Sequence, residues 1–279
     1  MRKPQNPLND RQIKAVKDAM IVCRDRLSPF SLPIYKHKIK GPPEPIGTGF
    51  VVDYFGTCYF VSAAHVMDHH EPEEPLFYFV NELDRQYIKG KSRTSSNDSA
   101  ARKNDKIDVT VVKLPDGEGR PDEIINHSVI SRDMITPDTT EIDDCRFIVA
   151  GYPVTRQKVD YKNKRLNMNC YLWLGKSIHN ETYLKLNVDK SQNILIQFER
   201  KNIIRSDNIV DSQFPEPQGI SGSPVWHTVG YRNEEKILVI EKVLLAGLLI
   251  EHMPKNKALL ATSINIVLSM IIDLHNDVD

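Results

Sequence analysis

The sequence is a succession of short runs rich in β-branched and aromatic residues, each bounded by glycine, proline or small polar residues. Residues 48–54 and 58–63 are the clearest pair, and Phe55-Gly56-Thr57 between them predicts a tight hairpin. Further strands are predicted at 30–35, 75–80, 106–114, 145–151, 169–174, 182–188, 193–198, 236–250 and 258–262. Many short strands with turn signals between them favour antiparallel barrels or a sandwich over alternating β-α units.

Helical periodicity is expected near the two ends of the chain. Apolar residues recur at helical spacing between Asp10 and Asp25, and Asn9-Asp10 can cap the first turn. Residues 263–275 predict a C-terminal amphipathic helix. Packing of the N-terminal helix on a barrel is favoured over a role as a regulatory or partner-docking element.

The prolines around residues 30–35 predict that the strand expected there lies at a sheet edge.

Changes in composition divide the chain into halves. Residues 115–144 are acidic, poor in aromatic residues and contain three prolines, which predicts a connector. The expected domains are an N-terminal helical segment (1–28), a first β-barrel (29–115), a connector (116–144), a second β-barrel (145–262) and a C-terminal helix (263–279). Within these, residues 92–105 predict a polar surface loop, and the strand 236–250 is expected to break near Glu241-Lys242.

The composition is that of a soluble globular protein. Of 279 residues, 40% are hydrophobic and 27% are charged, and the 37 Lys and Arg balance the 37 Asp and Glu. This balance gives no general attraction to nucleic acid or to an anionic membrane. No signal peptide or membrane span is evident, and the four cysteines show neither paired spacing nor a C-x-x-C. We therefore expect a reduced, cytoplasmic protein.

The stretch 218–226 places Ser221 between Gly219 and Gly222 and then a proline. A serine hydroxyl becomes a useful nucleophile when an imidazole takes its proton and backbone N–H groups face the oxyanion that forms. Gly219 allows the backbone to turn so that its own N–H and that of Ser221 face one point. Glycine, serine and proline also cluster in ordinary turns. The catalytic interpretation therefore depends on a matching histidine and carboxylate upstream.

Such residues are present, and the order His65, Asp108, Ser221 is the order of the triad in chymotrypsin. The motifs around them resemble the successive signatures of trypsin-like serine peptidases of the chymotrypsin superfamily, and the bacterial, disulfide-free cytoplasmic members above all. The matching stretches are Gly47-Thr48-Gly49-Phe50-Val51-Val52, Phe60-Val61-Ser62-Ala63-Ala64-His65-Val66, Asp108-Val109-Thr110-Val111-Val112-Lys113-Leu114 and Gly219-Ile220-Ser221-Gly222-Ser223-Pro224. Residues 151–153 and 245–250 also fit strands of that family, so the resemblance covers roughly residues 30–275.

The resemblance implies two antiparallel β-barrels with an active site in the cleft between them. His65 would be general base and then general acid, Asp108 would orient it, and Ser221 would form an acyl-enzyme with a peptide or protein substrate. The N–H groups of Gly219 and Ser221 would form the oxyanion hole. The substrate-binding edge would consist of Ile250, Glu251 and His252. No metal or organic cofactor is implied. Because no pro-segment is evident, regulation by a protein partner or by a disordered active-site loop is expected.

Four positions depart from the secreted members of this family. Ile220 replaces the aspartate that receives a new N-terminus on zymogen activation, and Val66 replaces a cysteine of the disulfide beside the histidine. Ile250 stands where many relatives carry a hydroxyl that steadies the aspartate. Pro215, six residues before Ser221, offers no charge to select a basic side chain. The first two departures favour a cytoplasmic protein.

Three other hypotheses stay open. A protein of this fold that binds peptides without cutting them, within a larger assembly, is the main alternative to a peptidase. A metal site is conceivable because His65 and His69 are four residues apart, with His70, Asp68 and Glu71 nearby, although a solvated turn is favoured. The basic run Arg156, Lys158, Lys162, Lys164 and Arg165, with Tyr161, is favoured as a solvated loop over a contact with RNA or an acidic partner.

Overall fold

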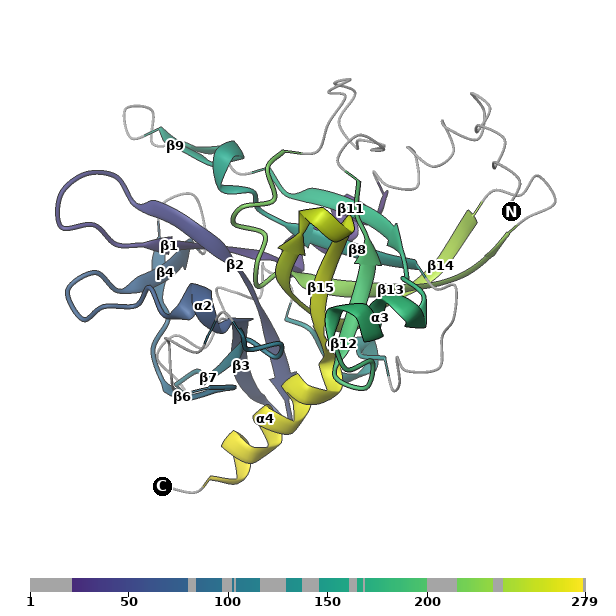
Figure 1. The fold of residues 1–279 in the computed structure, drawn as a ribbon. Coiled ribbons are helices and arrows are strands. Elements are labelled where there is room, and N and C mark those ends of the chain that lie inside the picture. The colour runs from purple at the N-terminus through teal and green to yellow at the C-terminus, as the bar shows by residue number, and fades with distance from the viewer. Residues whose placement is uncertain are drawn as a thin grey trace.

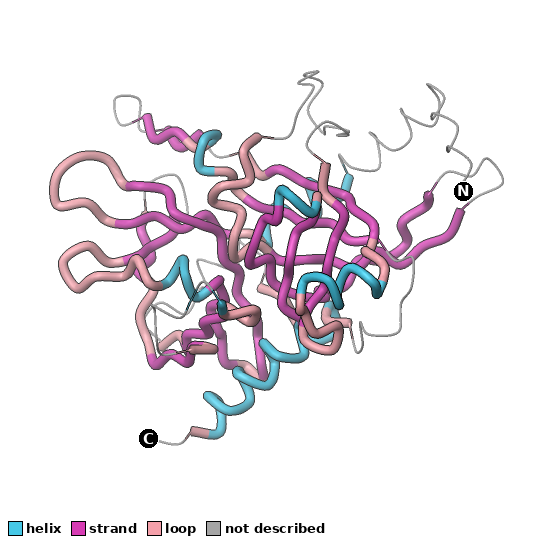
Figure 2. The backbone as a smooth tube through the Cα atoms, viewed as in Figure 1, coloured by secondary structure: helices cyan, strands magenta, loops and turns pink. Residues whose placement is uncertain are grey.

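A computed structural model describes residues 22–79, 84–96, 102, 104–115, 129–136, 146–160, 165–167, 169–199, 215–232 and 238–277. Strands dominate this part of the chain and form two curled antiparallel sheets, one from each half of the sequence (Figures 1 and 2). The prediction of a mainly β protein with two such units and a C-terminal helix is confirmed. Most of the expected helix 10–25 lies outside the described residues, but residues 22–27, which are described, are helical.

The first sheet has seven strands in the order β5-β4-β1-β2-β3-β7-β6. Their bounds are β1 Leu32–Lys36, β2 Glu44–Tyr54, β3 Thr57–Ala63, β4 Leu76–Phe79, β5 Arg85–Tyr87, β6 Lys91–Thr94 and β7 Val109–Lys113. The predicted hairpin joins β2 to β3, and positive φ angles at Phe55 (50°) and Gly56 (79°) make its turn type I′. The segment 92–105, expected to be a surface loop, begins within β6.

The prediction that β1 is an edge strand is wrong. It lies between β4 and β2, and all five of its residues are buried. Pro33 is tolerated because β4 pairs with β1 only at Tyr35 and Lys36, beyond the proline. The missing N–H of Pro33 therefore interrupts no pairing with the second neighbour.

The second sheet has six strands in the order β11-β8-β13-β14-β15-β12. Their bounds are β8 Arg146–Gly151, β11 Tyr171–Lys176, β12 Asn193–Gln197, β13 Pro224–Arg232, β14 Leu238–Met253 and β15 Ala258–Ser263. An antiparallel bridge between Ser177 and Ile196 brings the two outer strands together, so the sheet curls back on itself. A separate hairpin consists of β9 Lys158–Asp160 and β10 Arg165–Asn167.

Two strand predictions in this half are corrected. β14 does not break near Glu241, because a register shift against Val229 and Gly230 absorbs one residue as a bulge. Residues 182–188, expected to be a strand, lie mainly in the helix α3 (Asn180–Leu186). Their alternating pattern is misleading because Leu184 is 84% exposed. The helix is fixed through buried Tyr183, whose hydroxyl accepts a hydrogen bond from the amide of Leu195 (2.7 Å).

The C-terminal helix α4 (Ile264–Asn276) links the two halves. Ser263 caps its first turn, and the helix runs from β15 along the first sheet (Figure 1). His275 Nδ1 lies 2.8 Å from the hydroxyl of Tyr59. Residues 129–136, within the expected connector, also span both sheets through bridges of Ile130 to Val52 and Ile135 to Leu245. The rest of that connector lies outside the described residues.

Short helical turns complete the described elements. They are η1 Ser28–Phe30, η4 Arg132–Met134, η5 Val154–Arg156, η6 Pro254–Asn256 and the four-residue helix α2 Ala64–Met67. No helix in the described part of the chain is long and apolar enough to cross a membrane. The described cysteines Cys23, Cys58 and Cys170 form no disulfide, and Cys145 lies outside the described residues.

Candidate active site

His65 and Asp108 form a direct pair at one end of the first sheet. His65 lies in α2, which follows β3 without a loop, and Asp108 directly precedes β7, the neighbour of β3. The backbone amide of His65 donates to Asp108 Oδ1 (2.9 Å), and Nδ1 of the ring lies 2.5 Å from Oδ2. The amide of Ala64 donates to the carbonyl oxygen of Asp108 (2.9 Å). Backbone and side chain together therefore fix the position of the carboxylate.

Burial differs sharply across this pair. The side chain of Asp108 is 8% exposed, whereas that of His65 is 40% exposed. Asp108 also has a positive φ of 45°, a left-handed conformation that aspartate tolerates better than most residues. With Asp108 ionised, Nδ1 of His65 carries the proton of the shared hydrogen bond. The other ring nitrogen, Nε2, is then a proton acceptor, as a general base requires.

Two consecutive β-turns present Ser221. The amide of Ile220 donates to the carbonyl of Pro217 (3.2 Å), and the amide of Ser223 donates to the carbonyl of Ile220 (3.0 Å). The third residue of each turn is a glycine with positive φ, 90° at Gly219 and 88° at Gly222, as type II turns require. Neither turn uses the N–H groups of Gly219 and Ser221, which are the two expected oxyanion-hole donors.

The loop that carries Ser221 is bound directly to the first sheet through Thr48 of β2. The amide of Thr48 donates to the carbonyl of Ser221 (2.9 Å), and its hydroxyl donates to the carbonyl of Gly219 (2.9 Å). The same hydroxyl accepts a hydrogen bond from the amide of Tyr152 (3.2 Å). Thr48 was not singled out from the sequence as a site residue, although it lies within the motif at 47–52.

Gly47 is the spacer between the serine loop and the histidine helix. A Cβ atom added there would lie 2.6 Å from Cγ1 of Val66 and 3.3 Å from the carbonyl oxygen of Ser221. Val66 follows His65 directly, so the serine loop and the helix α2 approach each other at Gly47, which has no side chain. The structure thus brings His65, Asp108 and Ser221 to the same junction between the sheets.

The hydroxyl of Ser221 does not donate to His65 in this structure. Its Oγ donates to the carbonyl oxygen of Ile250 (3.4 Å), and no hydrogen bond joins it to the imidazole among the described residues. Catalytic hydrogen bonds are often long or misaligned without substrate. A rotation about χ1 of Ser221 would release its hydroxyl from the Ile250 carbonyl without a change in the backbone.

The expected substrate-binding residues Ile250, Glu251 and His252 lie on β14 next to Ser221. Pairing between β13 and β14 extends only as far as Leu248, so beyond that point β14 pairs with β15. Ile250 contributes its carbonyl while its side chain is buried. Glu251 Oε2 lies 3.3 Å from Nζ of Lys106, and the ring of His252 contacts that of Phe198, with the ring centroids 5.1 Å apart.

The histidine-rich turn after α2 uses its side chains in other contacts. Asp68 pairs with Arg102 (2.9 Å), and Glu71 pairs with Lys36 (2.7 Å). Nδ1 of His70 accepts a hydrogen bond from the amide of Leu76 (3.4 Å). Within the described ranges, no cluster of three or more His, Cys, Asp or Glu side chains is arranged to hold a metal.

In the basic run, Tyr161, Lys162 and Lys164 lie outside the described residues.

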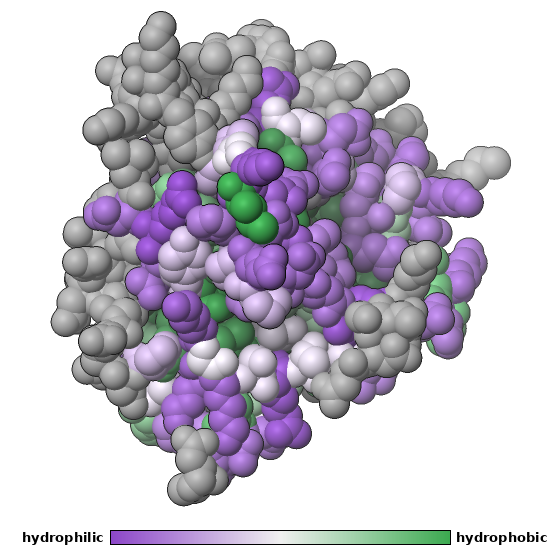
Figure 3. Space-filling model, turned by 90° about the vertical axis from the view of Figure 1, so that its left-hand side faces the viewer, coloured by the Kyte–Doolittle hydropathy of each residue, from purple (hydrophilic) through white to green (hydrophobic). Residues whose placement is uncertain are grey.

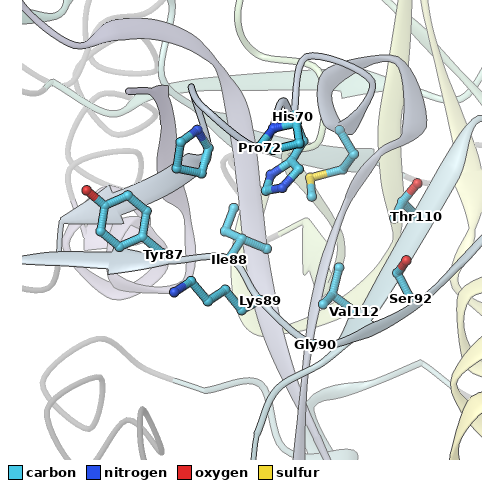
Figure 4. Close-up of a pocket in the computed structure, with 11 residues that line it drawn as sticks. His70, Pro72, Tyr87, Ile88, Lys89, Gly90, Ser92, Thr110 and Val112 are labelled. Atoms are coloured by element: carbon cyan, nitrogen blue, oxygen red, sulfur yellow. The ribbon is translucent and has the colours of Figure 1, made fainter. Parts of the chain in front are cut away.

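A pocket of about 540 Å³ opens beside this turn (Figure 4). Met67, His70, Tyr87, Ile88 and Val112 line it, and all its lining residues belong to the first half of the chain. His65, Asp108 and Ser221 are not among its lining residues. The face that carries the loops of the first sheet is mainly hydrophilic, with small separate hydrophobic areas (Figure 3).

Comparisons of sequence identify no relative: no protein-family model and no curated protein matches the chain. Comparison of structures does find neighbours. The VesB protease of Vibrio cholerae is similar with a TM-score of 0.50 and 12% identity, covering 90% of this chain and 65% of that one. The product complex of the catalytically active tobacco etch virus protease gives a TM-score of 0.43 and 9% identity, covering 86% and 74%. Together with the two curled antiparallel sheets, the VesB match shows that this chain has a chymotrypsin-like fold.

Proposed function

We propose that this protein is a trypsin-like serine endopeptidase, of the bacterial cytoplasmic type that needs no disulfides. The observation that carries the proposal is the junction itself: a buried Asp108 hydrogen-bonded to a half-exposed His65, beside a double turn that presents Ser221. The VesB similarity supports the fold in which this chemistry is expected.

In the proposed reaction, Nε2 of His65 takes the proton of Ser221 Oγ as that oxygen bonds to the scissile carbonyl carbon. The oxyanion that forms accepts hydrogen bonds from the N–H groups of Gly219 and Ser221, each typically worth about 2.7–4 kcal/mol in the transition state. The C–N bond then breaks, and the imidazolium returns its proton to the leaving amine. Water repeats the sequence on the acyl-enzyme, and Asp108 stays ionised throughout.

The substrate is an extended segment of a peptide or protein that lies along β14 beyond Leu248. There the carbonyl oxygen of Ile250 and the backbone of Glu251 and His252 offer strand-like hydrogen bonds. A substrate N–H that reached the Ile250 carbonyl would compete with Ser221 for this acceptor. The serine hydroxyl would then be released to turn towards His65.

The second candidate is a catalytically silent module that binds peptides within a larger assembly. The hydrogen bond from Ser221 to Ile250 favours it, because in this arrangement the serine is not hydrogen-bonded to its base. A regulatory protein partner that reorients Ser221 would reconcile the two candidates.

A fluorophosphonate probe distinguishes them, because it reacts with an activated serine and needs no knowledge of the natural substrate. The protein and the variant Ser221→Ala are incubated with the probe and compared by intact mass. We expect a single adduct on the protein and none on the variant. Ser223→Ala is the matched control: Ser223 lies in the same loop, is buried and donates to the Ile220 carbonyl, so this variant is expected to keep the adduct. Absence of any adduct on the folded protein would contradict a self-sufficient peptidase.

A further inference from the structure

The side chain of Arg102 joins the segment that follows His65 to the segment that precedes Asp108. Its Nε donates to Asp68 Oδ2 (2.9 Å) and its Nη2 donates to Asp68 Oδ1 (3.0 Å). The guanidinium and the carboxylate therefore form a bidentate salt bridge, called the fork below. Asp68 is the C-cap residue of α2, the helix of four residues that carries His65. One end of the link is therefore three residues from the candidate base.

The other end of the link lies in the loop that leads to Asp108. Nη1 of Arg102 donates to the carbonyl of Ser96 (2.8 Å) and lies 3.5 Å from Asp105 Oδ2. Asp105 is itself fixed, because it accepts hydrogen bonds from the hydroxyl of Ser95 (2.6 Å) and the amide of Ile107 (2.9 Å). Asp105 stands three residues before Asp108. The segment that follows His65 and the segment that precedes Asp108 therefore both bind the guanidinium of Arg102.

Burial distinguishes the Arg102–Asp105 end of this link from a surface ion pair, whereas the side chain of Asp68 at the other end is 34% exposed. The side chain of Arg102 is 8% exposed and that of Asp105 is 11% exposed. The hydrogen bond with Asp68 raises the pKa of the Arg102 guanidinium, and the charges of Asp108 and Asp105 add to this effect. Burial alone would raise the pKa of Asp105, but hydrogen bonds from Ser95, Ile107 and Asp108 outweigh it and lower the pKa. The Arg102 guanidinium and the Asp105 carboxylate are therefore both charged at neutral pH.

We propose that Arg102 is a positioning residue, which holds the His65 helix and the Asp108 loop in the register that their hydrogen bonds require. This inference rests on the proposed function, since it assigns a role within the same site. A planar guanidinium can bind two segments in fixed directions, whereas a lysine ammonium acts as a point charge without a fork. Loss of the guanidinium leaves the Asp68 and Asp105 carboxylates without the cation that joins them.

The test compares Arg102→Met and Arg102→Lys with the unaltered chain. We expect Arg102→Met to slow fluorophosphonate labelling of Ser221 by about 10- to 100-fold, as a displacement of about 1 Å at a catalytic pair does. Arg102→Lys should recover part of the melting temperature but little of the rate. Arg93→Met is the matched control. Arg93 of β6 pairs with Asp273 of α4 (3.1 Å), but both side chains are 49% exposed and neither contacts the site.

A spectroscopic measurement separates a positioning role from general destabilisation. The proton between Nδ1 of His65 and Asp108 gives a downfield NMR signal when it is protected in a short hydrogen bond. We expect the signal in Ser221→Ala, its loss or broadening when Arg102→Met is added, and no change when Arg93→Met is added. Because this readout needs no hydrolysis, it tests the link even if the unaltered protein fails to label. Failure to label would then count against the proposed function alone.

Should Arg102→Met not fold, Asp68→Asn decides the question. This variant keeps Arg102 and its contact with Asp105 but removes the charge at the end of α2 and one of the two acceptor oxygens that bind the guanidinium. We expect slower labelling and a weaker Nδ1 signal in the folded Asp68→Asn protein, in the same direction as for Arg102→Met but smaller. Folded variants at both positions that retain the rate and the signal of the unaltered protein would overturn the proposal.

Discussion

The amide of Thr48 donates a hydrogen bond of 2.9 Å to the carbonyl oxygen of Ser221, so a strand of the first sheet holds the candidate nucleophile of the second. The hydroxyl of the same threonine bonds the carbonyl of Gly219, one of the two expected oxyanion-hole residues (2.9 Å). The two halves of the chain are thus joined at the point where the chemistry is proposed. A change at Thr48 should affect stability and reactivity together.

Thr48→Val is expected to destabilise the protein by about 2–6 kcal/mol. The substitution preserves shape but leaves the carbonyl of Gly219 and the amide of Tyr152 buried without their partner, and each unsatisfied group costs about 1–3 kcal/mol. Chemical denaturation measures the free energy of unfolding, and fluorophosphonate labelling measures the reactivity of Ser221. Equal stability of the variant and the parent protein would contradict the role assigned to this hydroxyl.

Gly222→Ala is expected to destroy the arrangement of the serine loop. Its φ is 88°, and an added Cβ would overlap the carbonyl oxygen of Thr48 and lie 2.5 Å from the hydroxyl of Ser62. Gly41→Ala is the matched control, because Gly41 has a φ of 97° but no atom within 4 Å of the added Cβ. The control should lose about 1–2 kcal/mol from backbone strain alone. Gly222→Ala should lose roughly 1–3 kcal/mol more from overpacking, together with all labelling.

Comparable losses of stability in these two variants, measured by denaturation, would show that the close approach of Gly222 to Thr48 is not a tight constraint. Retention of labelling in Gly222→Ala would contradict the proposed loop geometry.

Asp108→Asn is expected to preserve the fold and to lower the proposed peptidase activity by about 10⁴-fold. The amide can still accept the backbone N–H of His65, and asparagine tolerates the positive φ of 45°. It no longer favours a proton on Nδ1, so the ring loses the tautomer in which Nε2 is the base. Single-turnover labelling measures the loss, and the melting temperature reports on the fold. A variant as reactive as the parent would exclude the pair from catalysis.

Buried His227 should make the protein less stable in mild acid. Burial lowers the pKa of His227 below its ordinary 6.5, so the unfolded chain takes up this proton more readily than the native protein. Stability is therefore full above about pH 6.5 and falls as the pH decreases from there through the native pKa. The drop in the melting temperature between about pH 7.5 and about pH 5.5 should be smaller in His227→Leu than in the parent.

The same comparison on His179→Leu supplies the control, because His179 is exposed. An identical drop in all three proteins would show that His227 does not contribute to the acid sensitivity.

Local sequence patterns predicted much of this structure. The β2–β3 hairpin follows from two β-rich runs joined through Phe55-Gly56, and α4 follows from an apolar stripe behind the cap Ser263. The pattern failed where the tertiary environment overrode it. Residues 182–188 alternate like a strand but fold as helix α3, where Tyr183 is buried and Leu184 is exposed to solvent.

In the candidate site, too, local sequence patterns predicted some features and missed those that depend on tertiary contacts. Motif order singled out His65, Asp108 and Ser221 as candidates, and the glycines on either side of Ser221 predicted its turns. Arg102 and Thr48 gave no such signal, because their importance comes from partners on other segments. Asp68 lies 34 positions from Arg102, and Ser221 lies far beyond Thr48 in the second half of the chain.

The sequence by itself thus determined the residue types that chemistry needs and the turns that local backbone preferences impose. These depend on interactions within a few residues, which a pattern records directly. Only the tertiary structure decided that β1 is internal, that Thr48 holds the serine loop and that Ser221 bonds Ile250 instead of His65. Those features arise from packing and hydrogen bonds between segments distant in sequence, whose register no single segment specifies.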